Sequence, residues 1–193
     1  RTTECCVVFS VAASGEIHDL RLHEVINTAD GALIGDLFHP SPPGDWSEAL
    51  YPVALRVARA LGEAGYFGPA CFDAFWYRTR QGPRLRPLCD LNARHPVSVG
   101  IHRLWRDGLA HRVLYFRFFN RAKLRLPEAP LLQSFGEAGY HPRERRGVLL
   151  AGPPRVALDG TWVAPAKLAV ALVGQNREEV LAMEADFRRR YER

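Results

Sequence analysis

The chain has 193 residues, of which 47% are hydrophobic and 24% charged, and its formal net charge is +5. These values describe an ordinary globular protein that is long enough to bury a core. No apolar run approaches the roughly 20 residues that cross a bilayer, so we expect no membrane partner. The excess positive charge comes from scattered arginines, with short basic runs only at 143–146 and 188–190. This scatter argues against nucleic acid as a partner.

Three strands, joined by tight turns into an antiparallel meander, are predicted at 5–12, 17–28 and 32–38. A helix is predicted to begin at Asp45 or Ser47 and to end near Glu63. Its apolar residues keep a 3.6-residue period, and Gly65 follows as a stop signal.

The remaining elements are less uniform. A β-hairpin at 69–94 is followed by a helix at 97–105, and the segment 109–119 is ambiguous between helix and strand. Later elements are predicted as a short helix within 127–140, strands at 147–152 and 167–173, a hairpin turn at 159–160, and a charged amphipathic helix at 177–191.

The four cysteines form one adjacent pair and two single residues: Cys5, Cys6, Cys71 and Cys89. None belongs to a C-x-x-C motif, which argues against the usual kind of zinc site. Nothing in the pattern demands disulfides. We therefore expect reduced, buried thiols and a cytoplasmic protein.

The predicted hairpin sorts its residues into two different faces. A turn centred between Gln81 and Gly82 places Asp73 opposite Asp90, and side chains two residues apart share a face. One face then carries Asp73, Phe75, Leu88, Asp90, Asn92 and Arg94. The other face is expected to join the core and carries Phe72, Ala74, Trp76, Cys89, Leu91 and Ala93.

Two carboxylates side by side on a sheet repel each other unless a cation lies between them. Mg²⁺ takes hard oxygen ligands, typically one or two carboxylates together with phosphate oxygens and water. Asn92 adds a neutral oxygen beside Asp90, and Arg94 can hold a phosphate or a carboxylate. This face therefore predicts a magnesium site for a phosphate-bearing cofactor. Two alternatives stay open: a solvated face on which Asp73 pairs with Arg86 or Arg94, and a register one residue off, which would separate the two aspartates.

The sequences GYFGPACFDAF and RPLCDLNARHP, on either side of the hairpin turn, resemble the metal-binding end of the ATP-grasp ligases. The resemblance is specific over residues 62–100 and extends more loosely to the meander and helix before them. It implies an α+β, ATP-grasp-like fold with a mostly antiparallel sheet flanked by helices. Residues 1–108 then correspond to the C-terminal part of the catalytic ATP-grasp domain, and residues 109–193 to an α/β extension packed on it.

In that superfamily two acids and an asparagine hold two Mg²⁺ ions that bridge the phosphates of ATP. The resemblance assigns these metal- and cofactor-binding roles to Asp73, Asp90 and Asn92, and it implies ATP and two Mg²⁺ ions as cofactors. Arg94 resembles the arginine that steadies the phosphate or the acyl intermediate in some members, so it is the candidate catalytic residue. Position 90 is more often glutamate in the family, and the shorter aspartate changes the metal geometry slightly.

The resemblance also implies a reaction. A substrate carboxylate attacks the γ-phosphate of ATP and gives an acyl phosphate and ADP, after which an amine, less often a thiol, displaces phosphate. The expected activity is therefore that of an ATP- and Mg²⁺-dependent carboxylate–amine (or carboxylate–thiol) ligase acting on small-molecule substrates. Such a reaction needs no side-chain nucleophile, and the sequence has no G-x-S-x-G motif. The alternative is a degenerate ATP-grasp module that binds or assembles without turnover.

The chain does not begin with Met and opens in what reads as a structured element, so we expect it to be part of a longer protein. The resemblance puts the segments that clamp adenine and phosphates before Arg1, in the N-terminal remainder of the same protein. It also places Arg1 or Glu4 near the substrate. Assembly into a homo-oligomer is compatible with these expectations.

Overall fold

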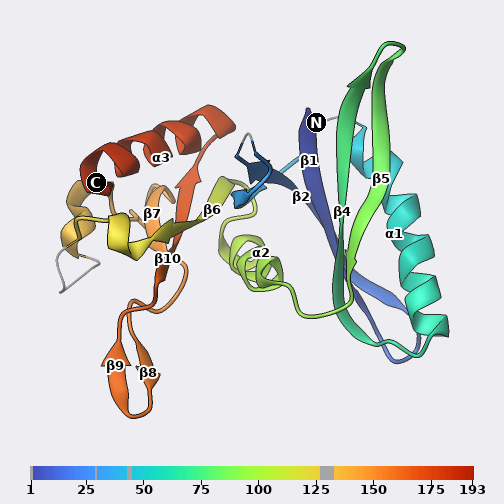
Figure 1. Cartoon of the computed structure of the whole chain (residues 1–193), viewed down its shortest axis with the longest axis horizontal. Helices are drawn as coiled ribbons and strands as arrows, with labels where there is room; N and C mark the ends of the chain where they lie inside the picture. The colour runs from blue at the N-terminus through green and yellow to red at the C-terminus, as the bar shows by residue number, and fades with distance from the viewer. Residues whose placement is uncertain (1, 29, 43–44, 127–132) are drawn as a thin grey trace. The chain divides into compact units, whose positions relative to one another are not determined.

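The computed structural model describes residues 2–28, 30–42, 45–126 and 133–193. The chain has an α+β fold and forms two compact units, Arg1–Leu104 and Trp105–Arg193 (Figure 1). None of the described helices combines the length and the apolar character needed to span a membrane.

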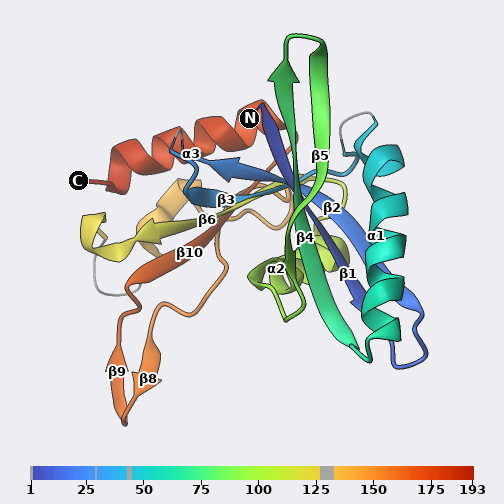
Figure 2. The same cartoon turned by 45° about the vertical axis from the view of Figure 1, so that its right-hand side comes forward.

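The N-terminal unit is built on five strands: β1 (Thr3–Val11), β2 (Ile17–Asn27), β3 (Leu33–Phe38), β4 (Gly68–Thr79) and β5 (Gly82–Asn92). They follow one another in space in the order β5-β4-β1-β2-β3, and each pair of neighbours is antiparallel. The predicted meander β1-β2-β3 is confirmed. The chain then returns to pair β4 with β1, so β1 lies at the centre of these five strands. Figure 2 shows the tip of the β4–β5 hairpin extending past the start of β1.

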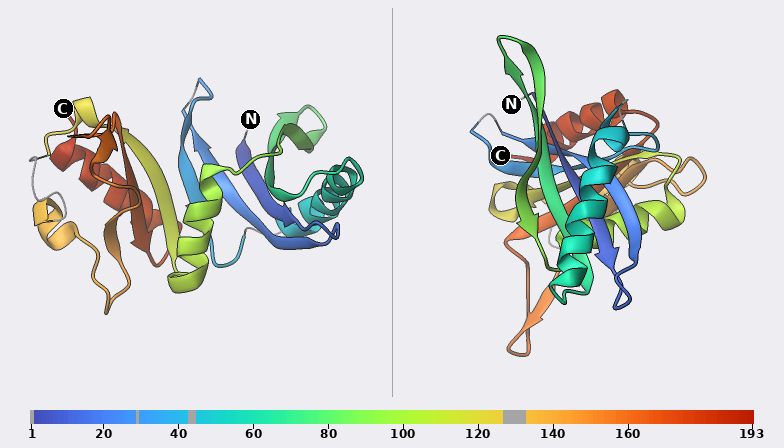
Figure 3. Two further views of the ribbon diagram at one scale, coloured as in Figure 1. Left: turned by 90° about the horizontal axis from the view of Figure 1, so that it is seen from below. Right: turned by 90° about the vertical axis from the view of Figure 1, so that its right-hand side faces the viewer.

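One face of these strands packs against α1 (Trp46–Glu63), which lies along it in Figure 3. The predicted start of this helix is confirmed, although Asp45 at the N-cap makes no side-chain capping bond. Gly65 follows the helix with a φ of 81°, a left-handed conformation that favours glycine. The core between helix and strands is made of small and large apolar side chains, chiefly Cys5, Val7, Phe9, Leu50, Ala54, Ala58, Phe72 and Ala74.

The opposite face of the N-terminal strands carries a much smaller apolar cluster. Cys6, Val8 and Cys71 are buried there together with Val99, which comes from α2 (Val97–Gly108). This asymmetry leaves room for a site on the side away from α1.

The C-terminal unit contains β6 (Val113–Asn120), β7 (Gly147–Leu150) and β10 (Lys167–Gly174), arranged in the order β6-β10-β7 with antiparallel neighbours. The helix α3 (Arg177–Tyr191) packs on them, and the rings of Phe119 and Phe187 lie 4.7 Å apart. The ambiguous segment 109–119 is therefore mainly a strand.

Short elements complete the C-terminal unit. They are the 3-10 helices η1 (Arg121–Lys123) and η2 (Gln133–Ala138) and a two-stranded hairpin, β8 (Val156–Leu158) with β9 (Thr161–Val163). The predicted turn at Asp159 and Gly160 joins these two strands. Of the short helix predicted within 127–140, the first part lies outside the described residues and the rest is η2, which is kinked at Gly136.

Candidate active site

The β4–β5 hairpin turns one residue earlier than predicted. Its two-residue loop is Arg80-Gln81, between the paired residues Thr79 and Gly82. The predicted turn centre, between Gln81 and Gly82, is therefore wrong by one position. With a regular ladder from this turn, the two aspartates would not lie opposite each other.

A bulge in β5 corrects the register. Phe75 pairs with Arg86, but the next recorded pair is Asp73 with Asp90. Between these two pairs β4 has one residue, 74, whereas β5 has three, 87–89. Extra residues in one strand of a pair define a bulge. The predicted pairing of Asp73 with Asp90 is confirmed, but it depends on this bulge, which the prediction from a uniform register did not include.

The two aspartates and Asn92 lie on the face away from α1. Asn92 pairs with Cys71, and its side-chain Nδ2 donates to Asp90 Oδ2 at 2.8 Å. Asp73 is half-buried, whereas Asp90 is exposed. Within the described part of the chain neither aspartate forms an ion pair with an arginine. The alternative in which Asp73 is neutralised by Arg86 or Arg94 is therefore not observed.

The core face of the hairpin is only partly as predicted. Phe72 and Ala74 of β4 are buried, but Leu91 is 41% exposed, and Cys89 and Ala93 are also exposed. The reason is that β5 is the edge strand, and the buried core beneath α1 is formed by β1 and β4. The expectation of buried thiols holds for three of the four cysteines and is wrong for Cys89.

A pocket of about 380 Å³ lies on this face of the N-terminal unit. Of the predicted site residues it is lined by Asp73, Asn92 and Arg94, but not by the exposed Asp90. Glu4 also lines it, whereas Arg1 lies outside the described residues. The other lining residues come from β1 to β4, the turn between β2 and β3, and the segment from Pro96 into α2: Cys5, Cys6, His23, Val25, Asn27, Gly31, Leu33, Asp36, Cys71, Pro96, Val97 and Ser98.

Residues in register form a polar row across four strands of this face. Asp90 pairs with Asp73, Asp73 with Cys6, and Cys6 with His23. Neighbouring strands lie about 4.8 Å apart, so His23 is roughly 10 Å from Asp73 along the row. Asp36 of β3 extends the row, because His23 Nε2 lies 3.5 Å from Asp36 Oδ1.

Sequence reasoning did not identify His23 and Asp36 as site residues. His23 belongs to no metal motif, and Asp36 lies in a short apolar strand. One signal was present in β2. Leu20 and Leu22 belong to the core beneath α1, and because side chains alternate along a strand, His23 points to the opposite face. Only the pairing of β2 with β3 brings the two polar side chains together.

The pKa shifts in the row follow from burial and charge. Burial raises the pKa of the Asp73 carboxyl, and the charge of Asp90 raises it further, against the opposing influence of the Cys6 thiol and His23. Burial also raises the pKa of Cys5 to about 12. A hydrogen bond with Cys71, together with burial, raises the pKa of Cys6. Cys5 and Cys6 therefore keep their protons at neutral pH and are not nucleophiles.

The oxygen donors of this face fit Mg²⁺ better than a metal enclosed by protein ligands. Among the residues described, no group of three or more His, Cys, Asp or Glu side chains could hold a metal ion. The donor set consists instead of two opposed carboxylates, Asp73 and Asp90, and the amide of Asn92. Burial and the charge of Asp90 both disfavour the ionised form of Asp73. Mg²⁺ is commonly held by one or two carboxylates and completes its shell with phosphate oxygens and water.

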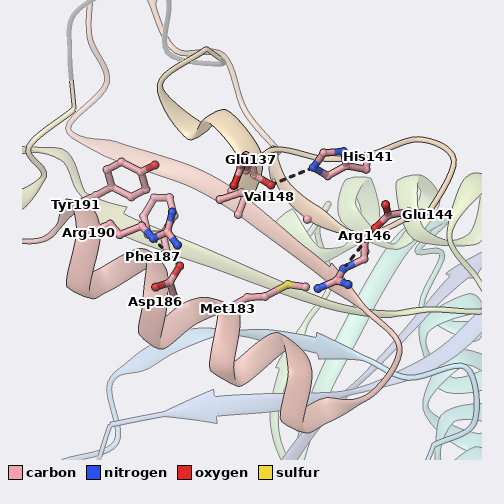
Figure 4. Close-up of a pocket in the computed structure, with 12 residues that line it drawn as sticks. Glu137, His141, Glu144, Arg146, Val148, Met183, Asp186, Phe187, Arg190 and Tyr191 are labelled. Carbon is pink, nitrogen blue, oxygen red and sulfur yellow. Dashed lines mark hydrogen bonds and ion pairs between the residues drawn. The ribbon is translucent and has the colours of Figure 1, made fainter.

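A second pocket, of about 390 Å³, lies in the C-terminal unit and is shown in Figure 4. It is lined by η2, the turn before β7, β7 itself and α3. Its two arginines are already paired: Arg190 Nε lies 2.7 Å from Asp186 Oδ2, and Arg146 Nη2 lies 3.1 Å from Glu179 Oε1. None of the predicted site residues lies here, so the candidate site is the pocket of the N-terminal unit.

No family model matches the chain, and no curated protein matches its sequence. Solved structures do match its fold. N5-carboxyaminoimidazole ribonucleotide synthetase from Thermus thermophilus aligns with a TM-score of 0.56 at 13% identity over 97% of this chain and 50% of that one. L-amino acid ligase from Bacillus licheniformis aligns with a TM-score of 0.55 at 12% identity, over 98% and 51% of the two chains.

A third structure is the biotin carboxylase domain of 2-oxoglutarate carboxylase from Hydrogenobacter thermophilus, in complex with MgADP, ADP and bicarbonate. It aligns with a TM-score of 0.56 at 12% identity, over 98% of this chain and 45% of that one. The chain therefore spans about half the length of the structures it matches. These structures are ATP-grasp ligases. The chain has the ATP-grasp fold.

Proposed function

We propose that the protein is an ATP- and Mg²⁺-dependent ligase that joins a carboxylate to an amine through an acyl phosphate. The observation that carries this proposal is the opposed pair Asp73–Asp90, with Asn92 on the same face of an ATP-grasp fold. Two unneutralised carboxylates at opposed positions are unfavourable unless a cation completes the site. The match to a structure that holds MgADP and bicarbonate supports a nucleotide and a small carboxylate-like substrate.

In this proposal Asp73, Asp90 and Asn92 hold Mg²⁺ together with the phosphates of ATP. The bound metal supplies charge neutralisation for phosphoryl transfer. The amide of Asn92 orients the carboxylate of Asp90 through a 2.8 Å hydrogen bond. Arg94 lines the pocket beside them and can bind an anionic oxygen of the phosphate or acyl group. The protein then acts by position and charge, without a side-chain nucleophile.

The test is calorimetric titration of MgADP into the full-length protein and three variants. Asp73→Asn and Asp90→Asn each remove one charged ligand and keep the size of the side chain, so we expect each to weaken MgADP binding at least tenfold. Asp45→Asn is the matched control, because Asp45 is an exposed aspartate of the same unit whose side chain makes no capping bond. Binding that is equally tight in all four proteins would refute the assignment.

One observation favours the second candidate, a degenerate module without turnover. Asp90 is exposed, does not line the pocket and is one methylene shorter than the glutamate that the family usually has there. The same titration separates the two functions. No heat with MgADP in the wild-type protein would favour the degenerate module, whereas saturable, Mg²⁺-dependent heat supports the ligase.

A further inference from the structure

The outer part of the β4–β5 hairpin is strongly basic, and the proposed function leaves it unused. Residues 75–86, which we call the arm, contain four arginines and no carboxylate: Arg78, Arg80, Arg84 and Arg86. Figure 2 shows the tip of the arm extending past the start of β1. Within the described part of the chain none of these arginines forms an ion pair, so the arm keeps its full positive charge.

The register of the hairpin sorts the arm into two faces. Phe75 pairs with Arg86, and Tyr77 pairs with Arg84. Trp76, between the two aromatic residues, stacks on a ring of α1 with 5.1 Å between the centroids. Because side chains alternate along a strand, the two aromatic–arginine pairs lie on the face away from α1. We call these four side chains the basic–aromatic face of the arm.

The basic–aromatic face continues the candidate metal site along the same two strands. Asp73, Phe75 and Tyr77 are alternate residues of β4, and alternate side chains of a strand lie about 6.8 Å apart on one face. The row of Arg86 is therefore one such step from the aspartate pair, and the row of Arg84 is two steps from it. An extended chain bound along this face would reach the metal site with one end.

Arg84 and Arg86 are available to an anionic ligand. Both side chains are exposed. Arg84 Nη2 donates to Gln81 Oε1 at 2.7 Å, but this acceptor is neutral and leaves the charge of the guanidinium in place. Opposed residues of a hairpin are commonly stabilised by pairs of opposite charge, whereas here an aromatic ring lies opposite each arginine. The face thus presents two cations about 6.8 Å apart above an apolar floor.

This spacing matches an acidic peptide in an extended conformation. Its side chains at alternate positions also repeat at about 6.8 Å on one face, and a guanidinium binds a carboxylate through two parallel hydrogen bonds. β5 is an edge strand, but Pro83 and Pro87 each lack a backbone donor. Recognition by side chains is therefore favoured over the addition of a further strand.

The aromatic rings favour a peptide over a single-stranded nucleic acid. The rings of Phe75 and Tyr77 meet edge to face, with 5.9 Å between their centroids and 61° between their planes. Successive bases stack on aromatic faces in proteins that bind single strands. Two rings at this angle do not offer parallel faces to neighbouring bases, but they can pack against the aliphatic parts of a peptide.

We propose that the basic–aromatic face of the arm binds an acidic peptide, with carboxylates at alternate positions held by Arg84 and Arg86. The inference rests on the proposed function and names its substrate class: the bound peptide supplies the carboxyl group that is activated at the metal site. Arg84 and Arg86 determine specificity and take no part in the chemistry.

The test uses two pentapeptides with blocked ends, each built from two aspartates and three alanines. In one peptide a single alanine separates the aspartates, and in the other the aspartates are adjacent. Binding to the full-length protein is followed by saturation-transfer NMR of the peptide at low ionic strength. We expect the peptide with separated aspartates to bind at least threefold more tightly. Arg84→Gln and Arg86→Gln should each weaken its binding about fivefold, the upper end for an exposed ion pair, and the double variant more than tenfold.

The matched control is Arg78→Gln, which removes the same charge from the other face of the arm, because Arg78 follows Tyr77 in β4. Its substitution should change the affinity less than twofold. A four-nucleotide oligothymidine is titrated in parallel. Equal affinity for the two peptides, tighter binding of the oligothymidine, or unchanged affinity in the double variant would each overturn the proposal. So would the absence of saturable peptide binding, which is the result expected if the arginines only protect an edge strand.

The two proposals fail in different ways. Asp90→Asn should lose MgADP binding and keep peptide binding, whereas the Arg84→Gln, Arg86→Gln double variant should show the reverse. If the wild-type protein binds the peptide through these arginines but binds no MgADP, the ligase proposal fails while the arm stands as a peptide-binding surface. If MgADP binds and neither peptide does, the arm proposal fails alone.

Discussion

Replacing Asp73 by asparagine is expected to stabilise the protein when magnesium and nucleotide are absent and to remove their stabilising effect. The substitution keeps the shape of the side chain and removes one of two opposed negative charges. Most substitutions of a half-buried residue destabilise. A gain in stability would therefore be specific evidence that the ionised carboxylate is under repulsion.

The size of the gain follows from the geometry. Opposed pairs on a sheet contribute about 0.2–1 kcal/mol, with like charges unfavourable. For a chain of this length 1 kcal/mol shifts Tm by about 2–4 °C, so we expect Asp73→Asn to raise Tm by a few degrees at most. Ligand at 100 times its Kd adds about 2.7 kcal/mol, which would raise the Tm of the wild-type protein by about 5–11 °C.

The pH dependence has a definite sign. Burial raises the pKa of Asp73, and a group with a raised pKa contributes stability that is complete below its unfolded pKa and is lost as pH rises through its folded pKa. The gain in stability of Asp73→Asn over the wild-type protein should therefore be larger at pH 7 than in the acidic range where Asp73 is protonated. Mg²⁺ bound to the carboxylate should abolish that difference by favouring the ionised form.

The assay is thermal unfolding of both proteins at pH 7 and at acidic pH, with and without Mg²⁺ and ADP. Asp45→Asn serves as the charge-matched control and should behave like the wild-type protein throughout. The reasoning is refuted if Asp73→Asn lowers Tm at pH 7 without ligand, or if the variant gains as much from Mg²⁺ and ADP as the wild-type protein.

Three further outcomes are expected from other parts of the chain. In the native protein a thiol reagent should modify Cys89 first, because Cys89 is exposed while Cys5, Cys6 and Cys71 are buried. Cys89→Ser should remove the fast phase of the modification, and a fast phase that persists in this variant would contradict the exposed position of Cys89. Phe187→Ala should cost about 3–5 kcal/mol of unfolding free energy, since its ring is 2% exposed and packs on Phe119; a loss below 1 kcal/mol by denaturant titration would contradict this packing. Gly147→Ala should destabilise more than Gly160→Ala, because both have positive φ but of the two only Gly147 would bring a Cβ against backbone, at the carbonyl oxygen of Gly139; equal losses would show that this contact relaxes.

Local signals in the sequence predict most elements of the N-terminal unit. Turns at Gly15 and Gly31 and the stop at Gly65 separate the strands and α1 much as expected, and all three glycines have positive φ. The insertion of β4 beside β1 was not predictable in the same way, because it joins residues about 70 positions apart and depends on which apolar faces pack together.

The candidate site was likewise only partly predictable from local signals. Asp73 and Asp90 lie opposite each other as predicted, yet the turn lies one residue earlier and a bulge in β5 restores the pairing. Periodicity alone assumes a uniform ladder and cannot locate a bulge. His23 and Asp36 were missed because their meeting depends on the pairing of β2 with β3, and neither residue belongs to a motif that signals a site.

The most direct measurement is a crystal structure of the full-length protein with ADP and Mn²⁺, which substitutes for Mg²⁺ and is located by its anomalous scattering. We predict an anomalous peak roughly 2.1 Å from carboxylate oxygens of both Asp73 and Asp90, next to the phosphates of ADP. A bound nucleotide whose metal lies away from these two aspartates, or a peak that persists unchanged in the Asp73→Asn, Asp90→Asn double variant, would contradict the proposed site.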